Sequence, residues 1–309
     1  MTELSPRLQH NKELFDKASL PPRYPPVTDQ IDTSIVEELP PFAYNPSLID
    51  YDGKLWIAAR HHPNQSMESR LVVANLLEER RVTNSHTLYI PGNSQEDPRL
   101  FVYHDKLHVS FVESQFPRAR NAAVYFGELA WDMIPHKVLP QLPGNDGTTI
   151  QKNYVFFDWK GRLFCIYGST PEQMVYEVST DGTVAIPFVS KGPVWPYGEI
   201  RGGTVPLPYE GKLLRFFHSG ADTERGKQRR RYCIGAALME AQPPFTTVAV
   251  SKRPILWGSE VPVVKCRQFK PMVVYVSGAV QRDWGWLLSC GIQDSMSLLA
   301  RVTPEKLNL

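Results

Sequence analysis

A short strand–turn–strand pattern of apolar and polar positions recurs along almost the whole chain. Each polar turn follows a short polar–apolar stretch and precedes an apolar run such as LWIAAR, LHVSFVE or LFCIYGS. The turns are Asp52-Gly53-Lys54, His104-Asp105-Lys106, Lys160-Gly161-Arg162, Glu210-Gly211-Lys212 and the looser Asp283-Trp284-Gly285. The first four are roughly fifty residues apart, which indicates one repeated unit that buries its apolar face against its neighbours. Five such units around an axis predict an all-β, five-bladed propeller.

The remaining segments fit one repeat domain with a short extension. Residues 1–30 are polar and proline-bearing (PPRYPP), and we interpret them as a short helix and an extended arm. Residues 31–309 are predicted to form the propeller, because apolar runs bounded by Gly, Pro, Asp and Asn are typical of strands. The blades are expected at about residues 43–85, 95–140, 150–190, 200–256 and 262–303.

Composition narrows the classes of partner. The net charge of +2 gives no reason to expect a nucleic-acid or membrane partner, and no run approaches the ~20 apolar residues of a membrane helix. The first residues, MTELSPRLQHNKELF, lack the basic and apolar stretches of a signal peptide. The cysteines form no CxxC pair, so we expect small buried side chains, no metal site and a cytoplasmic protein.

An arginine-rich stretch, residues 224–231, lies between two expected strands of the fourth blade. We interpret it as a solvated hairpin loop, and contact with a phosphate or an anionic sugar is the alternative. A homo-oligomer is compatible with the sequence, which carries no signal for or against it.

Polar groups cluster at the starts of the blades, just before the repeated turn. Because the innermost strand of each blade lines the axis of a propeller, these groups are expected to face one another. The segments are Tyr44-Asn45-Pro46-Ser47, Gln95-Glu96-Asp97-Pro98-Arg99, Gln151-Lys152-Asn153-Tyr154 and Glu199-Ile200-Arg201-Gly202-Gly203-Thr204, followed later in the blades by His218, Tyr232 and Asp294. Carboxyl groups from different blades that face each other are what glycoside cleavage requires.

Each of these residues also has a purely structural interpretation. Asn45 could form a turn, and Glu96 and Asp97 could be a turn acid pair with Arg99 as their ionic partner. The two glycines at 202 and 203 could serve simply to bring the backbone close to the axis. His218 could be an inner-strand histidine whose hydrogen bonds are all made within the fold. Their recurrence at one blade position favours a shared site.

Several segments carry a resemblance to a known family. They are EDPRLFVYHDKLHVSFVES, QKNYVFF, IRGGTVPLPYEGKLLRFFHSG, RRYCIGAALMEAQPPFTTVAVSKRPIL and VVYVSGAVQRDWGWLLSCGIQDS. From about residue 40 to 303 the chain resembles glycoside hydrolase family 130, which contains β-mannoside phosphorylases, β-mannosidases and mannosyltransferases on a five-bladed propeller. The resemblance implies a carbohydrate substrate, no cofactor, and inorganic phosphate as the co-substrate if the chain is a phosphorylase.

The resemblance also implies roles for individual residues. Asp97 matches the catalytic acid of an inverting reaction. Further matches are to residues that hold the terminal sugar (Asn45, Arg60, Arg99, Asp294) and to residues near the phosphate or nucleophile (Lys152, His218, Tyr232). Asn153 and Arg201, which stand in the same blade segments, complete the candidate substrate-binding set.

Two departures from the family pattern affect the expected reaction. Glu199 stands where phosphorylases carry a lysine, and Gly168 stands where an arginine is expected, with Arg201 as a partial replacement. A phosphorylase must hold a dianion, which needs cations or strong donors. We therefore expect hydrolysis, with Asp97 as acid, Glu199 as base and their carboxyls ~6.5–9.5 Å apart, as in inverting enzymes.

Two other functions remain as alternatives. A phosphorylase or glycosyltransferase on the same scaffold would use an anion site formed by the polar residues of blades 3 and 4, namely Lys152, Arg201, His218 and Tyr232. A non-catalytic propeller that binds a glycan is the third possibility.

Overall fold

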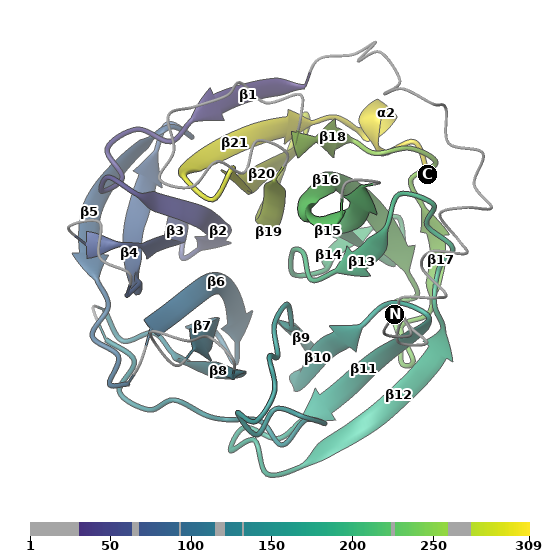
Figure 1. The fold of residues 1–309 in the computed structure, drawn as a ribbon, viewed down its shortest axis with the longest axis horizontal. Coiled ribbons are helices and arrows are strands. Elements are labelled where there is room, and N and C mark those ends of the chain that lie inside the picture. Colours follow the sequence, from purple (N-terminus) through teal and green to yellow (C-terminus); the bar gives the residue numbers. More distant parts are fainter. Residues whose placement is uncertain are drawn as a thin grey trace.

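The chain forms five small β-sheets arranged in a ring around a central axis (Figure 1). The computed structural model describes residues 31–63, 68–92, 94–114, 121–131, 133–223, 226–258 and 273–309, with the side chains of residues 222–230 excluded. The predicted all-β, five-bladed propeller is confirmed. The arm predicted for residues 1–30 and the expected start of the fifth blade lie outside the described residues.

Blades 1 to 3 are antiparallel sheets whose strands run outward from the axis in chain order. Blade 1 contains β2 (Ala43–Tyr51), β3 (Lys54–His61), β4 (Arg70–Leu77) and β5 (Arg81–Thr87). Blade 2 contains β6 (Ser94–Tyr103), β7 (Lys106–Ser114) and β8 (Ala122–Glu128). Blade 3 contains β9 (Val155–Trp159), β10 (Arg162–Gly168), β11 (Glu172–Val178) and β12 (Ala185–Lys191).

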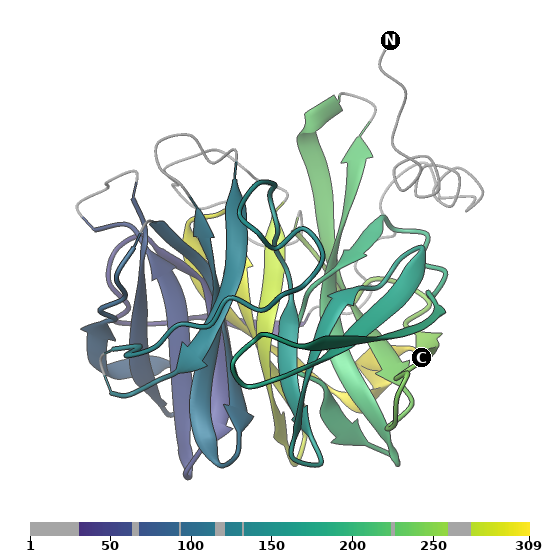
Figure 2. The ribbon, with the colours of Figure 1, turned by 90° about the horizontal axis from the view of Figure 1, so that it is seen from below.

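The last two blades are less regular. Blade 4 contains β13 (Glu199–Arg201), β14 (Leu207–Tyr209), β15 (Lys212–Thr223), β16 (Gly226–Met239), β17 (Thr247–Val250) and β18 (Leu256–Trp257). Blade 5 contains β19 (Val274–Arg282), β20 (Gly285–Ile292) and β21 (Met296–Val302), and α2 (Pro304–Leu307) follows it. The β15–β16 hairpin extends beyond the other described strands (Figure 2). Residues 226–231 of the arginine-rich stretch belong to strand β16 and not to the expected loop, because they pair with β15, and residues 224–225 lie outside the described residues.

The repeated turns are two-residue hairpins that join the first strand of a blade to the second. In blade 1, Tyr51 pairs with Lys54, and both residues between them have positive φ (52° at Asp52 and 66° at Gly53). The same conformation recurs at His104-Asp105, Lys160-Gly161 and Glu210-Gly211. Two consecutive left-handed residues define the type I′ turn, whose twist matches that of the flanking strands. The turn that is repeated in the sequence is therefore repeated in the backbone.

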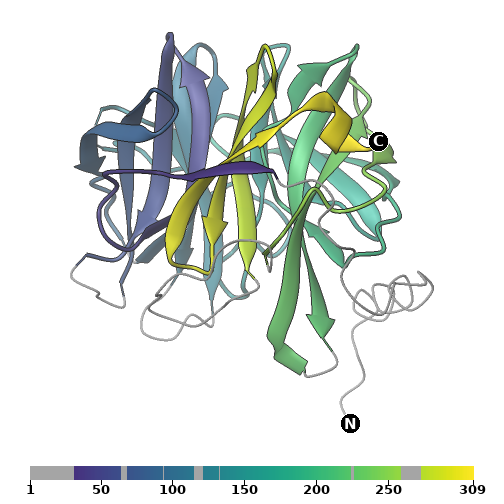
Figure 3. The same ribbon diagram turned by 90° about the horizontal axis from the view of Figure 1, so that it is seen from above.

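The ring is closed by a strand from the other end of the chain. β1 (Asp32–Ile35) pairs antiparallel with β21, so that Asp32 faces Arg301 and Ile35 faces Leu298 (Figure 3). The backbone amide of Val36 continues this ladder with a hydrogen bond to the Ser297 carbonyl, at 3.1 Å. Blade 5 thus combines residues that are far apart in the sequence.

The hydrophobic core is divided among the interfaces between neighbouring blades. Phe216 and Ile234 of blade 4 pack in one cluster with Val274 and Leu288 of blade 5, and each other pair of adjacent blades has a cluster of this kind. Cys165 and Cys290 are buried in two of these clusters, and burial raises the pKa of both thiols. In the described part of the chain, no helix is long and apolar enough to cross a membrane.

Candidate active site

The inner strands of blades 1 and 2 carry the same local irregularity, and it positions two candidate residues. In β6, Glu96 faces Val112 but Arg99 faces Ser110, so β6 has one residue more than its partner between these pairs. Asp97 occupies this bulge with φ of 52°, and Asn45 has the same φ in the equivalent bulge of β2. Asn and Asp tolerate the left-handed region, and a bulge can accept the proline that follows each of them. The bulges lie where the inner strands begin, at the axis.

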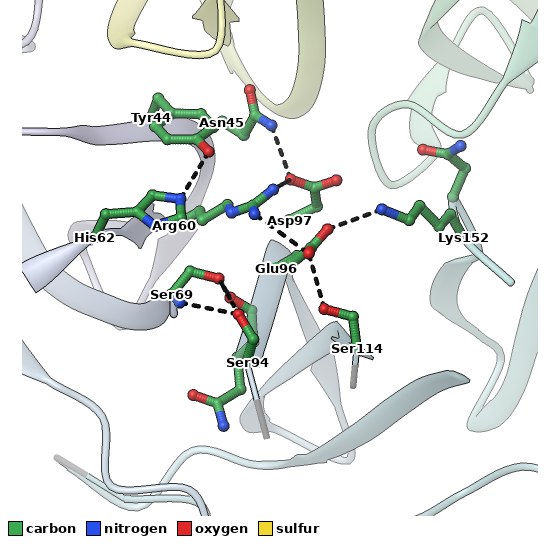
Figure 4. A network of polar contacts seen from close by, with 12 residues as sticks. Tyr44, Asn45, Arg60, His62, Ser69, Ser94, Glu96, Asp97, Ser114 and Lys152 are labelled. Atoms are coloured by element: carbon green, nitrogen blue, oxygen red, sulfur yellow. Dashed lines mark hydrogen bonds and ion pairs between the residues drawn. The ribbon is translucent and has the colours of Figure 1, made fainter. Parts of the chain in front are cut away.

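Asp97 is buried and is held by residues from blade 1. Asn45 Nδ2 donates a hydrogen bond to Asp97 Oδ1 at 2.8 Å, and Arg60 Nη1 lies 3.9 Å from the same oxygen (Figure 4). Burial acts to raise the pKa of Asp97, but the charges of Arg60 and Lys152 and the bond from Asn45 outweigh it and hold this pKa below its usual range. Asp97 is therefore a carboxylate at neutral pH in the ligand-free protein.

Glu96 joins cations from two blades on either side of its own. Its Oε1 is 3.2 Å from Arg60 Nη2 and accepts a hydrogen bond from Ser114 at 2.9 Å, and its Oε2 is 2.8 Å from Lys152 Nζ (Figure 4). The charges of Arg60 and Lys152 lower the pKa of Glu96 although burial acts in the opposite direction. Burial would lower the pKa values of Arg60 and Lys152, but the two carboxylates raise both. Arg60, Glu96, Asp97 and Lys152 form one network across three blades.

Arg99 connects this network to blades 3 and 4. Its Nη2 donates to Asn153 Oδ1 at 3.2 Å, and its Nε donates to the Gly203 carbonyl at 3.3 Å. Arg99 also donates to the backbone carbonyl of Asp97, at 3.4 Å, whereas the ionic contacts of the Glu96 and Asp97 carboxylates are with Arg60 and Lys152. Arg99 therefore acts on the acid pair through this backbone contact and through its charge, which helps to lower the pKa of Asp97, while Arg60 and Lys152 form the direct ion pairs.

The glycine pair allows blade 4 to approach this closely. Gly203 has φ of 117°, and a Cβ at this position would lie 2.0 Å from the Phe216 carbonyl oxygen. A Cβ at Gly202 would lie 2.7 Å from Arg99 Nη2. The clash at Gly203 is with backbone, so this position requires glycine, whereas at Gly202 the end of the Arg99 side chain would have to shift.

His218 and Tyr275 are neighbouring buried rings next to Arg99. Both are buried, and their ring centroids are 4.5 Å apart, while Arg99 Cζ lies 5.3 Å from the centroid of the Tyr275 ring. Burial, reinforced by the charges of Arg99 and Arg201, lowers the pKa of His218 well below its ordinary value. Burial raises the pKa of Tyr275. The two rings are therefore uncharged at neutral pH.

Glu199 belongs to a separate ion pair. Arg201 Nε donates to Glu199 Oε2 at 2.9 Å, and its Nη2 contacts the same oxygen. In β13, Glu199 faces Gly220 and Arg201 faces His218, so this pair lies beside the histidine. Glu199 thus has a cation as a neighbour, and its role as the catalytic base stays a prediction.

The remaining candidates lie at the edge of these groups. Asp294 follows β20 with φ of 49° and is half-buried, and its charge acts on Tyr44, Arg60 and Tyr275. Tyr232 is half-buried opposite Gly220 in the β15–β16 ladder. The structure therefore joins six candidates in one connected network, partly through Glu96: Asn45, Arg60, Asp97, Arg99, Lys152 and Asn153. It places four others together on blade 4: Glu199, Arg201, His218 and Tyr232.

Three residues of the site received no catalytic or binding role from sequence, although two of them, Tyr44 and Glu96, stand in the polar segments that were expected to meet. Glu96 is the centre of the ion-pair network, and Tyr44 lies under Arg60, whose Cζ is 5.4 Å from the Tyr44 ring centroid. Tyr44 also forms a 2.9 Å hydrogen bond with His62 Nε2. Glu96 and Tyr44 each precede the bulge residue of their blade, and this shared position in the sequence could have identified them. Tyr275 lies within an apolar strand and gave no such signal.

Comparison with known proteins identifies the fold. No protein-family model matches the chain, and no curated protein matches it in sequence. Among solved structures, the chain is similar to MPT-1, a GDP-Man-dependent mannosyltransferase from Leishmania mexicana, with a TM-score of 0.66, 14% identity and coverage of 96% of this chain and 94% of that one. It is also similar to MPT-4, a mannose phosphorylase from the same organism in complex with phosphate ion, with a TM-score of 0.62, 16% identity and coverage of 96% and 93%.

A third similar structure concerns hydrolysis. It comes from the glycoside hydrolase family 130 of mannoside phosphorylases, which contains glycoside hydrolases that target β-1,2-mannosidic linkages in Candida mannan. Its TM-score is 0.62, with 15% identity and coverage of 92% of this chain and 97% of that one. These likenesses extend over nearly the full length of both chains. The chain therefore has the five-bladed propeller fold seen in glycoside hydrolase family 130 and in related mannosyl-transferring enzymes.

Proposed function

We propose that this chain is a carbohydrate-active enzyme that cleaves a β-linked mannoside or a similar glycoside with inversion. One observation carries the proposal: a buried carboxylate, Asp97, lies on a bulge at the propeller axis, in contact with Asn45 and Arg60 of the neighbouring blade. Acid–base chemistry on a sugar needs a carboxyl group that is fixed in place and surrounded by hydrogen-bonding groups. The named activities of the similar structures support mannose as the sugar.

In the proposed reaction, Asp97 protonates the leaving oxygen and Glu199 removes a proton from the attacking water. The bond from the anomeric carbon to the leaving oxygen breaks as the bond to the water oxygen forms, so water is consumed and no other reactant is needed. Asp97 must take up its proton when substrate binds, because in the ligand-free protein it is ionised. A sugar that displaces water from the carboxylate favours this uptake, since desolvation raises the pKa of an acid.

The charge balance of the site supports water as the nucleophile. The four cations are Arg60, Arg99, Lys152 and Arg201, and the four carboxylates are Glu96, Asp97, Glu199 and Asp294. The formal charges of these eight side chains sum to zero. A phosphate dianion would add negative charge to a set that is already balanced, whereas a water molecule would not.

A second candidate, transfer of the sugar to phosphate or from a nucleotide diphosphate, is favoured by a different observation. The charges of Arg60 and Lys152 hold Asp97 ionised. An anion bound beside Lys152 would offset these charges and raise the pKa of Asp97, which would make it a better acid. Phosphate could then act both as nucleophile and as the activator of Asp97.

Product analysis separates these functions. We expect release of α-mannose from β-1,2-mannobiose, followed by NMR of the anomeric proton, at a rate that does not depend on phosphate. Mannose 1-phosphate as the product, with a rate that rises with phosphate, would establish the second candidate instead. The Asp97→Asn variant should lose turnover in either case. Sugar binding without turnover by the wild-type protein, unchanged in Asp97→Asn, would identify a glycan-binding propeller.

We also infer that the enzyme is cytoplasmic. Cys165 and Cys290 are free thiols in the described part of the chain, as is common for proteins of reducing compartments. Fractionation of cells that express the natural protein tests this inference, and recovery from a secreted or membrane fraction would contradict it.

A further inference from the structure

Two buried polar atoms near Arg99 lack hydrogen-bond partners among the described residues. They are the hydroxyl of Tyr275 and Nδ1 of His218. Buried polar groups are normally paired, and leaving one unpaired destabilises the folded protein. The two atoms belong to neighbouring rings, whose centroids are 4.5 Å apart.

Tyr275 is fixed in orientation. Its ring has two close neighbours, the Arg99 guanidinium, 5.3 Å from the ring centroid, and the His218 imidazole, and 6% of the residue is exposed. The charges of Arg99, Asp97, Arg60 and Asp294 all act on its hydroxyl, which places that hydroxyl beside the charged network. Burial keeps the hydroxyl protonated, so Tyr275 can donate a hydrogen bond.

His218 supplies the complementary function. The imidazole forms a hydrogen bond with the backbone of Val276, and it is neutral because burial and nearby arginines lower its pKa. A neutral imidazole that donates from one nitrogen to a backbone carbonyl presents its other nitrogen as an acceptor. Nδ1 of His218 is therefore an acceptor, next to the donor hydroxyl of Tyr275.

A donor beside an acceptor matches an alcohol group, which accepts one hydrogen bond and donates another. We propose that Tyr275 is a specificity-determining residue that donates a hydrogen bond to one hydroxyl oxygen of the bound sugar, while the proton of that hydroxyl points to His218 Nδ1. The inference rests on the proposed function, because it takes the ligand to be a sugar. It adds a named side chain that selects among sugars with and without that hydroxyl.

Replacing Tyr275 by phenylalanine tests the inference, because only the hydroxyl is lost. We expect Tyr275→Phe to have a Tm equal to or above that of the wild type, since the missing hydroxyl is unpaired in the ligand-free protein. We also expect its affinity for methyl β-mannoside, measured by calorimetry, to fall about tenfold to a hundredfold. The matched control is Tyr51→Phe, whose hydroxyl bonds to the Asp105 carbonyl at 2.9 Å near the repeated turn of blade 1.

The four monodeoxy derivatives of methyl β-mannoside identify the hydroxyl that is read. For one derivative, the wild type and Tyr275→Phe should bind equally, and for the other three the variant should remain weaker. The inference would be overturned if Tyr275→Phe lost the same affinity, relative to the wild type, for all four derivatives, if its Tm were lower, or if its affinity for the parent sugar were unchanged. A wild-type protein that binds none of these sugars would also overturn it. Because binding is measured without turnover, the two proposals can fail separately. A protein that binds these sugars but hydrolyses no glycoside refutes the proposed reaction, and the binding data for the four derivatives still decide the role of Tyr275.

Discussion

Replacing Arg60 by glutamine should raise the pKa of Asp97. Arg60 Nη1 lies 3.9 Å from Asp97 Oδ1, and the two side chains are 18% and 12% exposed. At an effective dielectric constant of ~20, two unit charges at this distance attract each other by about 4 kcal/mol, which corresponds to about 3 pKa units. Lys152 and Asn45 continue to stabilise the carboxylate in the variant. We therefore expect a rise of about 1–3 units, the range seen when an acid loses an arginine neighbour.

Carbon-13 NMR of aspartate-labelled protein can follow this change. The chemical shift of the Asp97 carboxyl carbon, assigned with Asp97→Asn, would be recorded against pH in the wild type and in Arg60→Gln. Lys106→Gln is a suitable control, because Lys106 pairs with exposed Glu128 at 2.8 Å, away from Asp97. Urea denaturation checks that the variant is folded, since breaking a buried ion pair costs about 3–5 kcal/mol.

The same change has a consequence for catalysis. If Asp97 is the acid, it must be protonated to act, so a higher pKa keeps it active to higher pH. The alkaline limb of kcat/KM should then move upward in pH by the same amount as the NMR pKa. An Asp97 pKa that stays constant or falls in Arg60→Gln would refute the electrostatic reasoning. A raised pKa with an unmoved alkaline limb would refute the role of Asp97 as the acid.

Three further predictions follow from the network and from the glycine pair. Glu96→Gln should lower the free energy of unfolding in urea by about 3–5 kcal/mol, because Arg60 and Lys152 lose a buried counter-charge. Ser114→Ala, which removes one hydrogen bond to the same carboxylate, should cost only about 1 kcal/mol. Equal costs for the two variants would contradict this prediction. The pKa values of Glu96 and Asp97 are lowered in the folded protein, so these two carboxylates stabilise the fold above the ordinary carboxyl pKa of about 4, and this stabilisation is lost as pH falls through their folded pKa values. The urea midpoint should therefore drop more steeply below about pH 4 in the wild type than in Glu96→Gln. Parallel pH profiles of the two proteins would argue against this reasoning. Gly203→Ala should prevent folding or strongly reduce the Tm. Gly211 also has positive φ, but a Cβ there would meet no atom within 4 Å, so Gly211→Ala should cost about 1 kcal/mol. Similar Tm values for the two variants would show that the clash with Phe216 does not determine the loss of stability.

The fold could be predicted from sequence because one local feature repeats. The four regular turns each place two residues in the left-handed region, and such a turn is encoded by the residues that form it. The participation of β1 in blade 5 could not be foreseen in this way, since its pairing with β21 depends on contacts between distant residues.

The site was predictable where it follows the repeat. Asn45 and Asp97 occupy the same position in adjacent blades, and their direct hydrogen bond agrees with that reasoning. The ion pair of Glu199 with Arg201 could also have been foreseen, because residues two apart on a strand point to the same face. Tyr275 could not, because its polar hydroxyl is embedded in a strand of apolar residues and only the packing of Arg99 and His218 against it marks the position.

Closure of the ring by β1 has a consequence for biosynthesis. β1 leaves the ribosome among the first segments of the domain, but its partner β21 is among the last. At about 5–20 residues per second, β1 waits on the order of tens of seconds with its hydrogen-bonding edge unpaired. During this interval the nascent chain exposes an open strand edge, which is a site for pairing with other chains. Chaperones that cover nascent strands would therefore be needed most before translation ends, and a slower ribosome would lengthen the time at risk.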